Sequence, residues 1–163
     1  NMAPRRTQQV GAGPSMEQTY ISKVVLLGSM ALGKSSIAFC YVKNDFRESM
    51  PTVGCSFFTQ LVCLETATIK LEIRDTAGQA KYHSVCHLYY SRANAELLVY
   101  DITRKIGSFR SCSRICWNAT VALSPDTLLF RKEAEEFAKS KSLIYMETSA
   151  KSNHQVTEVF MAI

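Results

Sequence analysis

The chain has 163 residues, of which 47% are hydrophobic, and its formal net charge is +5. This length fits one domain with a buried core, and no apolar run is long enough to cross a bilayer as a helix. No basic patch interleaved with aromatic residues accompanies the positive charge, so we expect no nucleic-acid partner. Six cysteines without a secretory signal favour reduced thiols in the cytoplasm.

Residues 1–19 are polar and rich in Gly, Pro and Arg, and we expect them to form a flexible arm. An apolar run at Lys23–Gly28, the motif GSMALGKS at Gly28–Ser35 and an amphipathic run at Ser36–Val42 follow. Strand, glycine loop and helix in this order are the context in which G-x-x-x-x-G-K-[ST] binds phosphate, through loop N–H groups and a lysine. We expect nucleotide contacts from Gly28, Ser29, Met30, Ala31, Leu32, Gly33, Lys34, Ser35 and Ser36.

A second strand end is expected to complete the phosphate site. Apolar and charged residues alternate over Ile69–Arg74, which is typical of a half-exposed strand, and Cys55–Leu64 is its expected hairpin partner. Asp75 comes directly after the alternating residues, at the strand end where open α/β sheets bind ligands. We expect Mg²⁺ to be bound by Ser35, Thr52 and Asp75.

The sequence DTAGQ continues from this carboxylate. Gly78 has no side chain, so its N–H can approach a γ-phosphate, which the N–H of Thr52 can also reach. Gln79 can orient an attacking water molecule, and we expect it to be the catalytic residue.

The second half of the chain contains two further apolar runs, Glu96–Tyr100 and Leu143–Met146, which we expect to be buried parallel strands. A helical pattern at Arg131–Ser140 lies between them. Strands that alternate with helices predict a three-layer α/β fold with a mostly parallel sheet. Helical spacing continues to Ile163, so we expect the sequence to be truncated within a helix.

The segments GSMALGKS, PTVG, DTAGQ, LLVYDIT and METSAK, in this order, resemble the Ras superfamily of small GTPases. KLEIRDTAGQ and the pair Tyr89–Tyr90 narrow the resemblance to the Rab family. It implies a P-loop NTPase fold over residues 20–163 and a switch in vesicle and membrane trafficking that binds GTP and GDP with Mg²⁺ and hydrolyses GTP. By the same resemblance, Ser149, Ala150 and Lys151 flank the guanine.

The resemblance also implies partners. Rab-type exchange factors, activating proteins and effectors would bind around Phe57, Arg74 and Tyr89, although Arg74 replaces the usual Trp. We expect a cytoplasmic monomer. It would reach endosomal or vesicle membranes only through a prenylated C-terminus that this sequence does not contain.

One internal segment departs from the family. The N/T-K-x-D motif, whose Asp reads guanine, does not occur between Asp101 and Glu147, and residues 106–130 match neither the helix nor the strand of the family. We therefore expect one internal strand to be missing, or replaced by Ala119–Leu123 with Asp126 as a distorted guanine acceptor. The alternative is a nucleotide-deficient remnant, or a splice or gene-model variant, that acts at most as a binding module.

Two smaller features bear on chemistry. Met30 stands where the family usually has a small residue, and its bulk should crowd Gln79 and slow hydrolysis. The pairs His83 with His87 and Cys112 with Cys116 have helical metal-ligand spacing, but they fall in an expected mobile segment and in the aberrant segment. We therefore expect no zinc.

Overall fold

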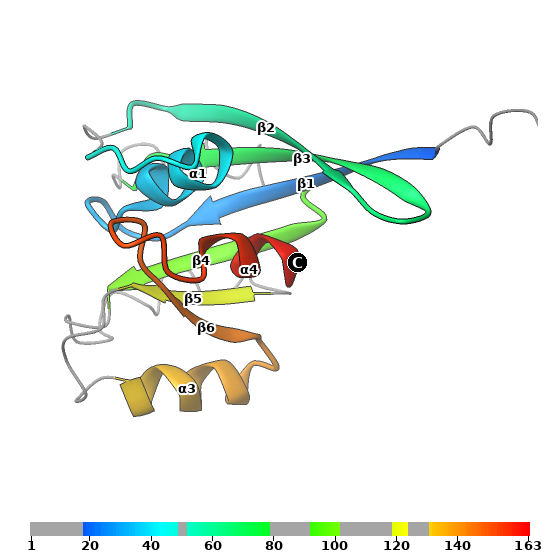
Figure 1. Ribbon diagram of the computed structural model, residues 1–163. Coiled ribbons are helices and arrows are strands. Elements are labelled where there is room, and N and C mark those ends of the chain that lie inside the picture. The colour runs from blue at the N-terminus through cyan, green and yellow to red at the C-terminus, as the bar shows by residue number, and fades with distance from the viewer. Residues whose placement is uncertain (1–17, 49–51, 79–91, 102–118, 124–130) are drawn as a thin grey trace, which may run out of the picture.

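The computed structural model describes residues 18–48, 52–78, 92–101, 119–123 and 131–163 (Figure 1). In this part of the chain six strands form one sheet in the order β2-β3-β1-β4-β5-β6. The strands are β1 Gln18–Leu27, β2 Cys55–Cys63, β3 Ala67–Thr76, β4 Ala95–Asp101, β5 Ala119–Leu123 and β6 Tyr145–Thr148. All neighbours run parallel except the β2–β3 hairpin at one edge, which confirms the expected mostly parallel sheet.

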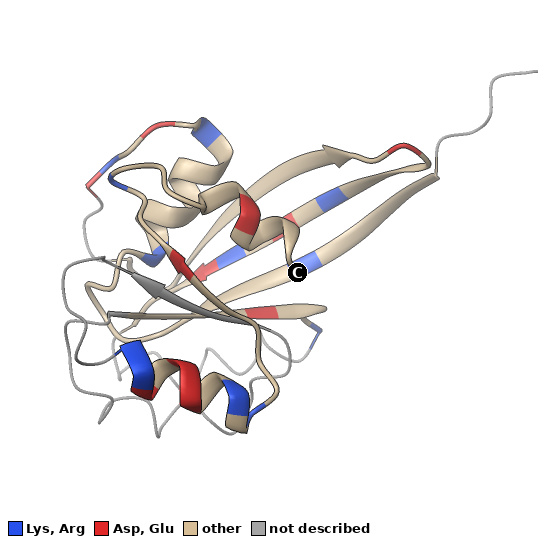
Figure 2. Cartoon of the chain, turned by 60° about the horizontal axis from the view of Figure 1, so that its bottom comes forward, with Lys and Arg blue, Asp and Glu red and all other residues tan. Residues whose placement is uncertain are grey.

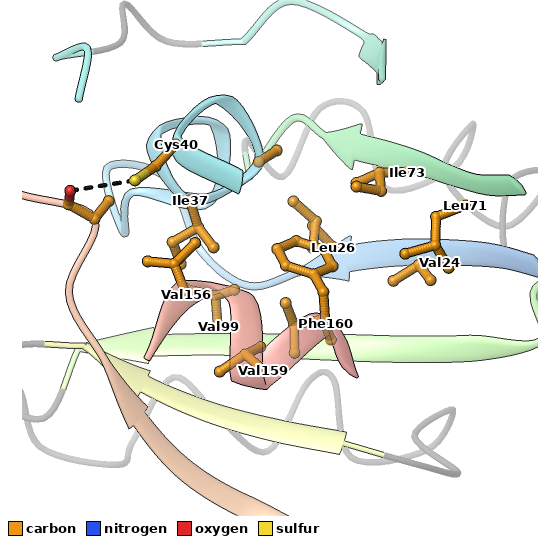
Figure 3. Packing of buried hydrophobic residues seen from close by; sticks show 13 residues of the cluster. Val24, Leu26, Ile37, Cys40, Leu71, Ile73, Val99, Val156, Val159 and Phe160 are labelled. Carbon is orange, nitrogen blue, oxygen red and sulfur yellow. Dashed lines mark hydrogen bonds between the residues drawn. The ribbon is translucent and has the colours of Figure 1, made fainter. Parts of the chain in front are cut away.

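Among the residues that the structure describes, three helices cover both faces of this sheet: α1 Lys34–Lys43, α3 Arg131–Ser140 and α4 Val156–Met161. Neighbouring residues of a strand point to opposite faces. Val24 therefore packs with Ile37 of α1 and Phe160 of α4 on one face (Figure 3). Val25 packs with Ala134 of α3 on the other. The expected three-layer α/β architecture is confirmed.

The loop between β1 and α1 depends on two glycines. Gly28 has φ 139° and Gly33 has φ 75°, values that side chains rarely allow. A Cβ at Gly28 would also lie 2.2 Å from the carbonyl oxygen of Val99. The chain therefore needs glycine where β1 runs against β4 and turns toward α1.

β5 fills the position at which the sequence predicts a missing or replaced strand. Val121 lies opposite Val99 of β4 on one side and opposite Met146 of β6 on the other. The backbone groups of both neighbours thus obtain partners, which a buried sheet requires. Of the two expected alternatives, a missing strand and a strand replaced by Ala119–Leu123, the structure shows the second, and Asp126 lies outside the described residues.

Several element boundaries differ from the sequence-based expectation. β6 begins at Tyr145, not Leu143, because the N–H of Leu143 donates to the carbonyl oxygen of Ala138 and closes the end of α3. Ala67 and Thr68 belong to β3, so the hairpin turn is tighter than expected. β1 begins at Gln18, within the range assigned to the N-terminal arm, and residues 1–17 lie outside the described part.

The helical spacing expected at the end of the sequence is observed in α4. Val156, Val159 and Phe160 are buried there, and Ile163 packs against the same cluster. Charged residues occur on α3 and along the β2–β3 hairpin (Figure 2). Within the described ranges no helix is long and apolar enough to cross a membrane.

Candidate functional site

Lys34 lies at the first position of α1 and is 5% exposed. Its Nζ donates to the carbonyl oxygens of Gly28, at 3.0 Å, and Ser29, at 2.7 Å. These bonds fold the side chain back along the glycine loop and hold a positive charge beside it. A charge held at a helix N-terminus next to loop N–H groups suits an anion.

Three oxygen-bearing side chains from three segments meet next to this loop. Ser35 Oγ donates to Asp75 Oδ2 at 2.5 Å and lies 2.7 Å from Thr52 Oγ1. Thr52 Oγ1 also donates to Asp75 Oδ2, at 3.2 Å. The structure therefore brings together the three residues that the sequence predicts as metal ligands.

Asp75 is the buried member of this group. Its side chain is fully inaccessible, and Oδ1 has no hydrogen-bond partner. Burial raises the pKa of Asp75 above its usual range, while the hydrogen bond from Ser35, the charge of Lys34 and the hydrogen bond from Thr52 oppose this rise. A buried carboxylate oxygen without a partner is costly unless a cation or donor meets it.

The segment after Asp75 lies directly on the glycine loop. A Cβ at Gly78 would lie 2.3 Å from the backbone nitrogen of Met30 and 2.3 Å from the carbonyl carbon of Ser29. The N–H of Ala77 donates to the carbonyl oxygen of Gly54, two residues after Thr52. The glycine loop, the Thr52 loop and the DTAG segment are thus in mutual contact.

The remaining residues of the expected phosphate loop differ in how far their side chains are exposed. Ala31 is exposed with φ 59°, and Met30 is 49% exposed. The side chain of Leu32 packs against the core, so only its backbone is available to a ligand. Ser36 is 7% exposed within α1.

The expected base-flanking residues lie in a closed loop after β6. Ser149 and His154 exchange two backbone hydrogen bonds, of 3.0 and 2.9 Å. Within this loop Ala150 is buried, and its carbonyl oxygen accepts a hydrogen bond from Cys40 of α1 (Figure 3). Lys151 is exposed. The loop is therefore fixed to the helix that also carries Lys34.

Of the remaining residues that the sequence singles out, the structure describes only some. Phe57 of β2 lies opposite Arg74 of β3 and is 56% exposed. The catalytic candidate Gln79 and the surface residue Tyr89 lie outside the described residues, as do both pairs with zinc-ligand spacing. Among the described residues no group of three or more His, Cys, Asp or Glu side chains is placed to hold a metal ion.

Two contacts near the site could not be foreseen from the sequence. Thr76 Oγ1 donates to the carbonyl oxygen of Leu26 at 2.6 Å and ties β3 to the end of β1. Arg131 forms an ion pair with Glu147, two residues before Ser149. Neither pair is close in sequence, so no local spacing marks them.

A family model described as the Ras family matches residues 23–163, which include all the segments that meet at this site. The chain belongs to the Ras family of small GTPases. Ras-related protein Rab-17 of Homo sapiens is 49% identical over 174 aligned residues, covering 97% of this chain and 81% of that protein. Ras-related protein Rab-17 of Mus musculus is 46% identical, with 93% and 78% covered.

Both relatives place the chain in the Rab group, so the family expected from the sequence is confirmed. Ras-family proteins are GTP-binding switches, and Rab proteins act in membrane trafficking. The matched range, residues 23–163, spans the segment 106–130 that departs from the family pattern.

Proposed function

We propose that this Rab-family chain binds GTP and GDP with Mg²⁺ and hydrolyses GTP. The observation that carries the proposal is the convergence of Ser35, Thr52 and Asp75 beside the glycine loop and Lys34. Lys34 and the N–H groups of the loop would bind the β- and γ-phosphates.

The oxygen cluster fits Mg²⁺. The three side chains offer only hydroxyl and carboxylate oxygens, the donors that this ion prefers, and Asp75 Oδ1 is buried without a partner. Ser35 and Thr52 would be direct ligands, and Asp75 would hold the ion through water. Bound Mg²⁺ would neutralise charge on the β- and γ-phosphates.

For hydrolysis, Gln79 would orient the attacking water and the N–H of Gly78 would contact the γ-phosphate. Intrinsic turnover in this class is slow, on the order of 10⁻⁴ to 10⁻³ s⁻¹. We expect Met30→Gly to hydrolyse GTP faster than the wild type, because Met30 adds bulk where water and Gln79 must align. Single-turnover hydrolysis by both proteins, with and without a Rab-type activating protein, checks this. Equal rates for the wild type and the variant in both conditions would show that Met30 does not slow hydrolysis.

The base end of the site would be formed by Ser149, Ala150 and Lys151, which flank the guanine. The sequence has no N/T-K-x-D motif between Asp101 and Glu147, so we expect the phosphates and Mg²⁺ to contribute most of the affinity.

As a switch in vesicle trafficking, the chain would act as a monomer with exchange factors, activating proteins and effectors. These would bind around Phe57, Arg74 and Tyr89, and Phe57 is well exposed for such a contact. We propose a cytoplasmic protein that binds endosomal or vesicle membranes where a prenylated C-terminus is present.

The missing guanine motif favours a second candidate, a nucleotide-deficient binding module. Dissociation constants for GTP and GDP, measured with Mg²⁺ and with chelator, separate the two. The switch predicts Mg²⁺-dependent binding, and Ser35→Asn should weaken GTP more than GDP because it alters the hydroxyl that would bind the ion. Absence of binding to either nucleotide would leave only the binding module.

A further inference from the structure

Arg131 at the start of α3 and Glu147 in β6 form a two-point ion pair. Arg131 Nη2 donates to Glu147 Oε2 at 2.7 Å, and Nε lies 2.6 Å from Oε1, an ion-pair contact without the geometry of a hydrogen bond. The hydroxyl of Tyr145 donates to Oε1 at 2.9 Å. Burial and the Glu147 carboxylate raise the pKa of Tyr145 above its usual range, so the phenol remains a donor near neutral pH. Both carboxylate oxygens are therefore engaged.

This pair constrains a strand that has few other constraints. β6 is the last strand of the described sheet, and β5 is its one strand neighbour there. The two strands share four residue pairs, from Thr120 with Tyr145 to Leu123 with Thr148. β5 is itself the strand that departs from the family. The side-chain bridge to α3 thus supplies a second attachment for the end of β6.

The loop that follows β6 is attached on its other side to α1. Cys40 Sγ lies 3.6 Å from the carbonyl oxygen of Ala150, and Asn153 Nδ2 donates to Asn44 Oδ1 at 3.0 Å. Thr148 Oγ1 donates to the carbonyl oxygen of His154, at 2.7 Å. The segment Ser149–Lys151 is therefore held between α1 on one side and the Arg131–Glu147 bridge on the other.

We propose that Arg131 is a positioning residue for the nucleobase: through Glu147 it fixes the end of β6 and so places Ser149–Lys151 against the base. This inference rests on the proposed function, in which that segment flanks the guanine. Because the chain has no N/T-K-x-D motif, this segment carries a larger share of base contact than in an intact family member. The residence time of the nucleotide then depends on how firmly Ser149–Lys151 is held in place.

The effect should be local. The side chains of Arg131 and Glu147 are 35% and 26% exposed, and ion pairs as accessible as this add little to global stability. Removing the bridge should therefore loosen Ser149–Lys151 without unfolding the domain. A general loss of stability would instead also loosen Gly28–Ser35.

The test measures Arg131→Gln, Glu147→Gln and the double variant that carries both changes. Lys132→Gln is the matched control. Lys132 is the exposed neighbour of Arg131, so its variant loses the same charge without breaking the bridge. Two quantities are measured on the whole chain: the dissociation rate of fluorescently labelled GDP, and the amide hydrogen exchange of Ser149–Lys151. Each single variant should release GDP about threefold to tenfold faster, and the double variant no faster than either, because the two residues act as one pair.

Local exchange should also rise at Ser149–Lys151 and stay unchanged at Gly28–Ser35. Arg131→Lys keeps the charge but loses the two-point geometry, so it should restore the wild-type rates only in part. Unchanged GDP release and unchanged exchange in Arg131→Gln would overturn the proposal, and so would an equal rise at Gly28–Ser35. A wild-type chain that binds no nucleotide would contradict the proposed function, and the exchange data would then still support or contradict the bridge by themselves.

Discussion

At the residue scale, Asp75 shows how burial and ligand binding oppose each other on one side chain. It is fully buried, Oδ1 has no hydrogen-bond partner, and its pKa is raised mainly by burial. A carboxyl group with a raised folded-state pKa favours folding below its unfolded pKa. This contribution is lost as the pH rises through the folded pKa. The ionised side chain is thus a cost to the metal-free protein at neutral pH.

We therefore expect Asp75→Asn to melt at a higher temperature than the wild type in Mg²⁺-free buffer at pH 7. The gap should close as the pH falls toward the ordinary range of Asp, about 4. About 1 kcal/mol corresponds to roughly 2–4 °C in a chain of this size. With Mg²⁺ and GTP the order should reverse, because the variant lacks the carboxylate charge that helps to hold the ion. Thermal melts across this pH range, with and without Mg²⁺ and GTP, check both expectations. A difference in melting temperature that does not change with pH would contradict the raised pKa of Asp75.

Gly78 gives a second prediction at this scale. In Gly78→Ala the new Cβ would meet backbone atoms of Ser29 and Met30, which cannot swing aside as a side chain does. We expect the DTAG segment to separate from the loop and GTP affinity to fall by about tenfold or more. Gly54→Ala is the matched control, because a Cβ there meets no atom within 4 Å and only the strain of φ 76°, about 1 kcal/mol, is added. Equal affinities in the two variants would show that the contact with the loop is unimportant.

At the scale of elements, β5 lies within residues 106–130, the segment that departs from the family pattern, and a substitution in it tests whether this segment is part of the fold. It pairs with β4 and with β6, so its backbone groups serve two neighbours. Val121→Pro removes a backbone N–H from a central strand and leaves its ladder acceptor without a donor, which costs about 3 kcal/mol, the upper range for a buried unsatisfied group. We expect the melting temperature to fall by roughly 6–12 °C. Val121→Ala, which keeps the N–H, should have a smaller effect, and equal melting temperatures for the two would argue against pairing on both sides.

Much of this architecture is predictable from local patterns. The glycine motif places β1 and α1, the alternation of Ile69–Arg74 places β3, and helical spacing places α3 and α4. These signals work because each reports which face of an element is buried. For Ala119–Leu123 the pattern left two alternatives, since a run of five residues, four of them apolar, does not decide between a replaced and a missing strand. The neighbouring strands decide between these alternatives, because β4 and β6 each have backbone groups that need a partner.

The site was predictable where one motif carries the chemistry, as at Lys34, Ser35 and Asp75. The boundary of β6 was not, because Leu143 is apolar like a strand residue yet closes the end of α3. The bridge between Arg131 and Glu147 was also missed. Its partners lie on different elements, and only the packing of α3 against the sheet brings them together.

At the scale of the whole molecule, the phosphate end and the base end of the site are not equally equipped. The phosphate end has the glycine loop, Lys34 and the oxygen cluster, whereas the sequence has no family motif for reading guanine. We expect ATP to compete with GTP better than in an intact family member. Competition binding measures this, and discrimination on the order of a thousandfold or more would mean that another residue replaces the missing Asp.

The central claim is that Ser35, Thr52, Asp75 and Lys34 form a working site for a nucleotide phosphate with Mg²⁺. Titration calorimetry with GTP, in Mg²⁺ and in chelator, for the wild type and for Lys34→Ala, tests it most directly. The wild type should bind GTP with an affinity that falls sharply on chelation, and Lys34→Ala should show no binding in either buffer. Binding that is equal with and without Mg²⁺, or that survives in Lys34→Ala, would contradict the claim.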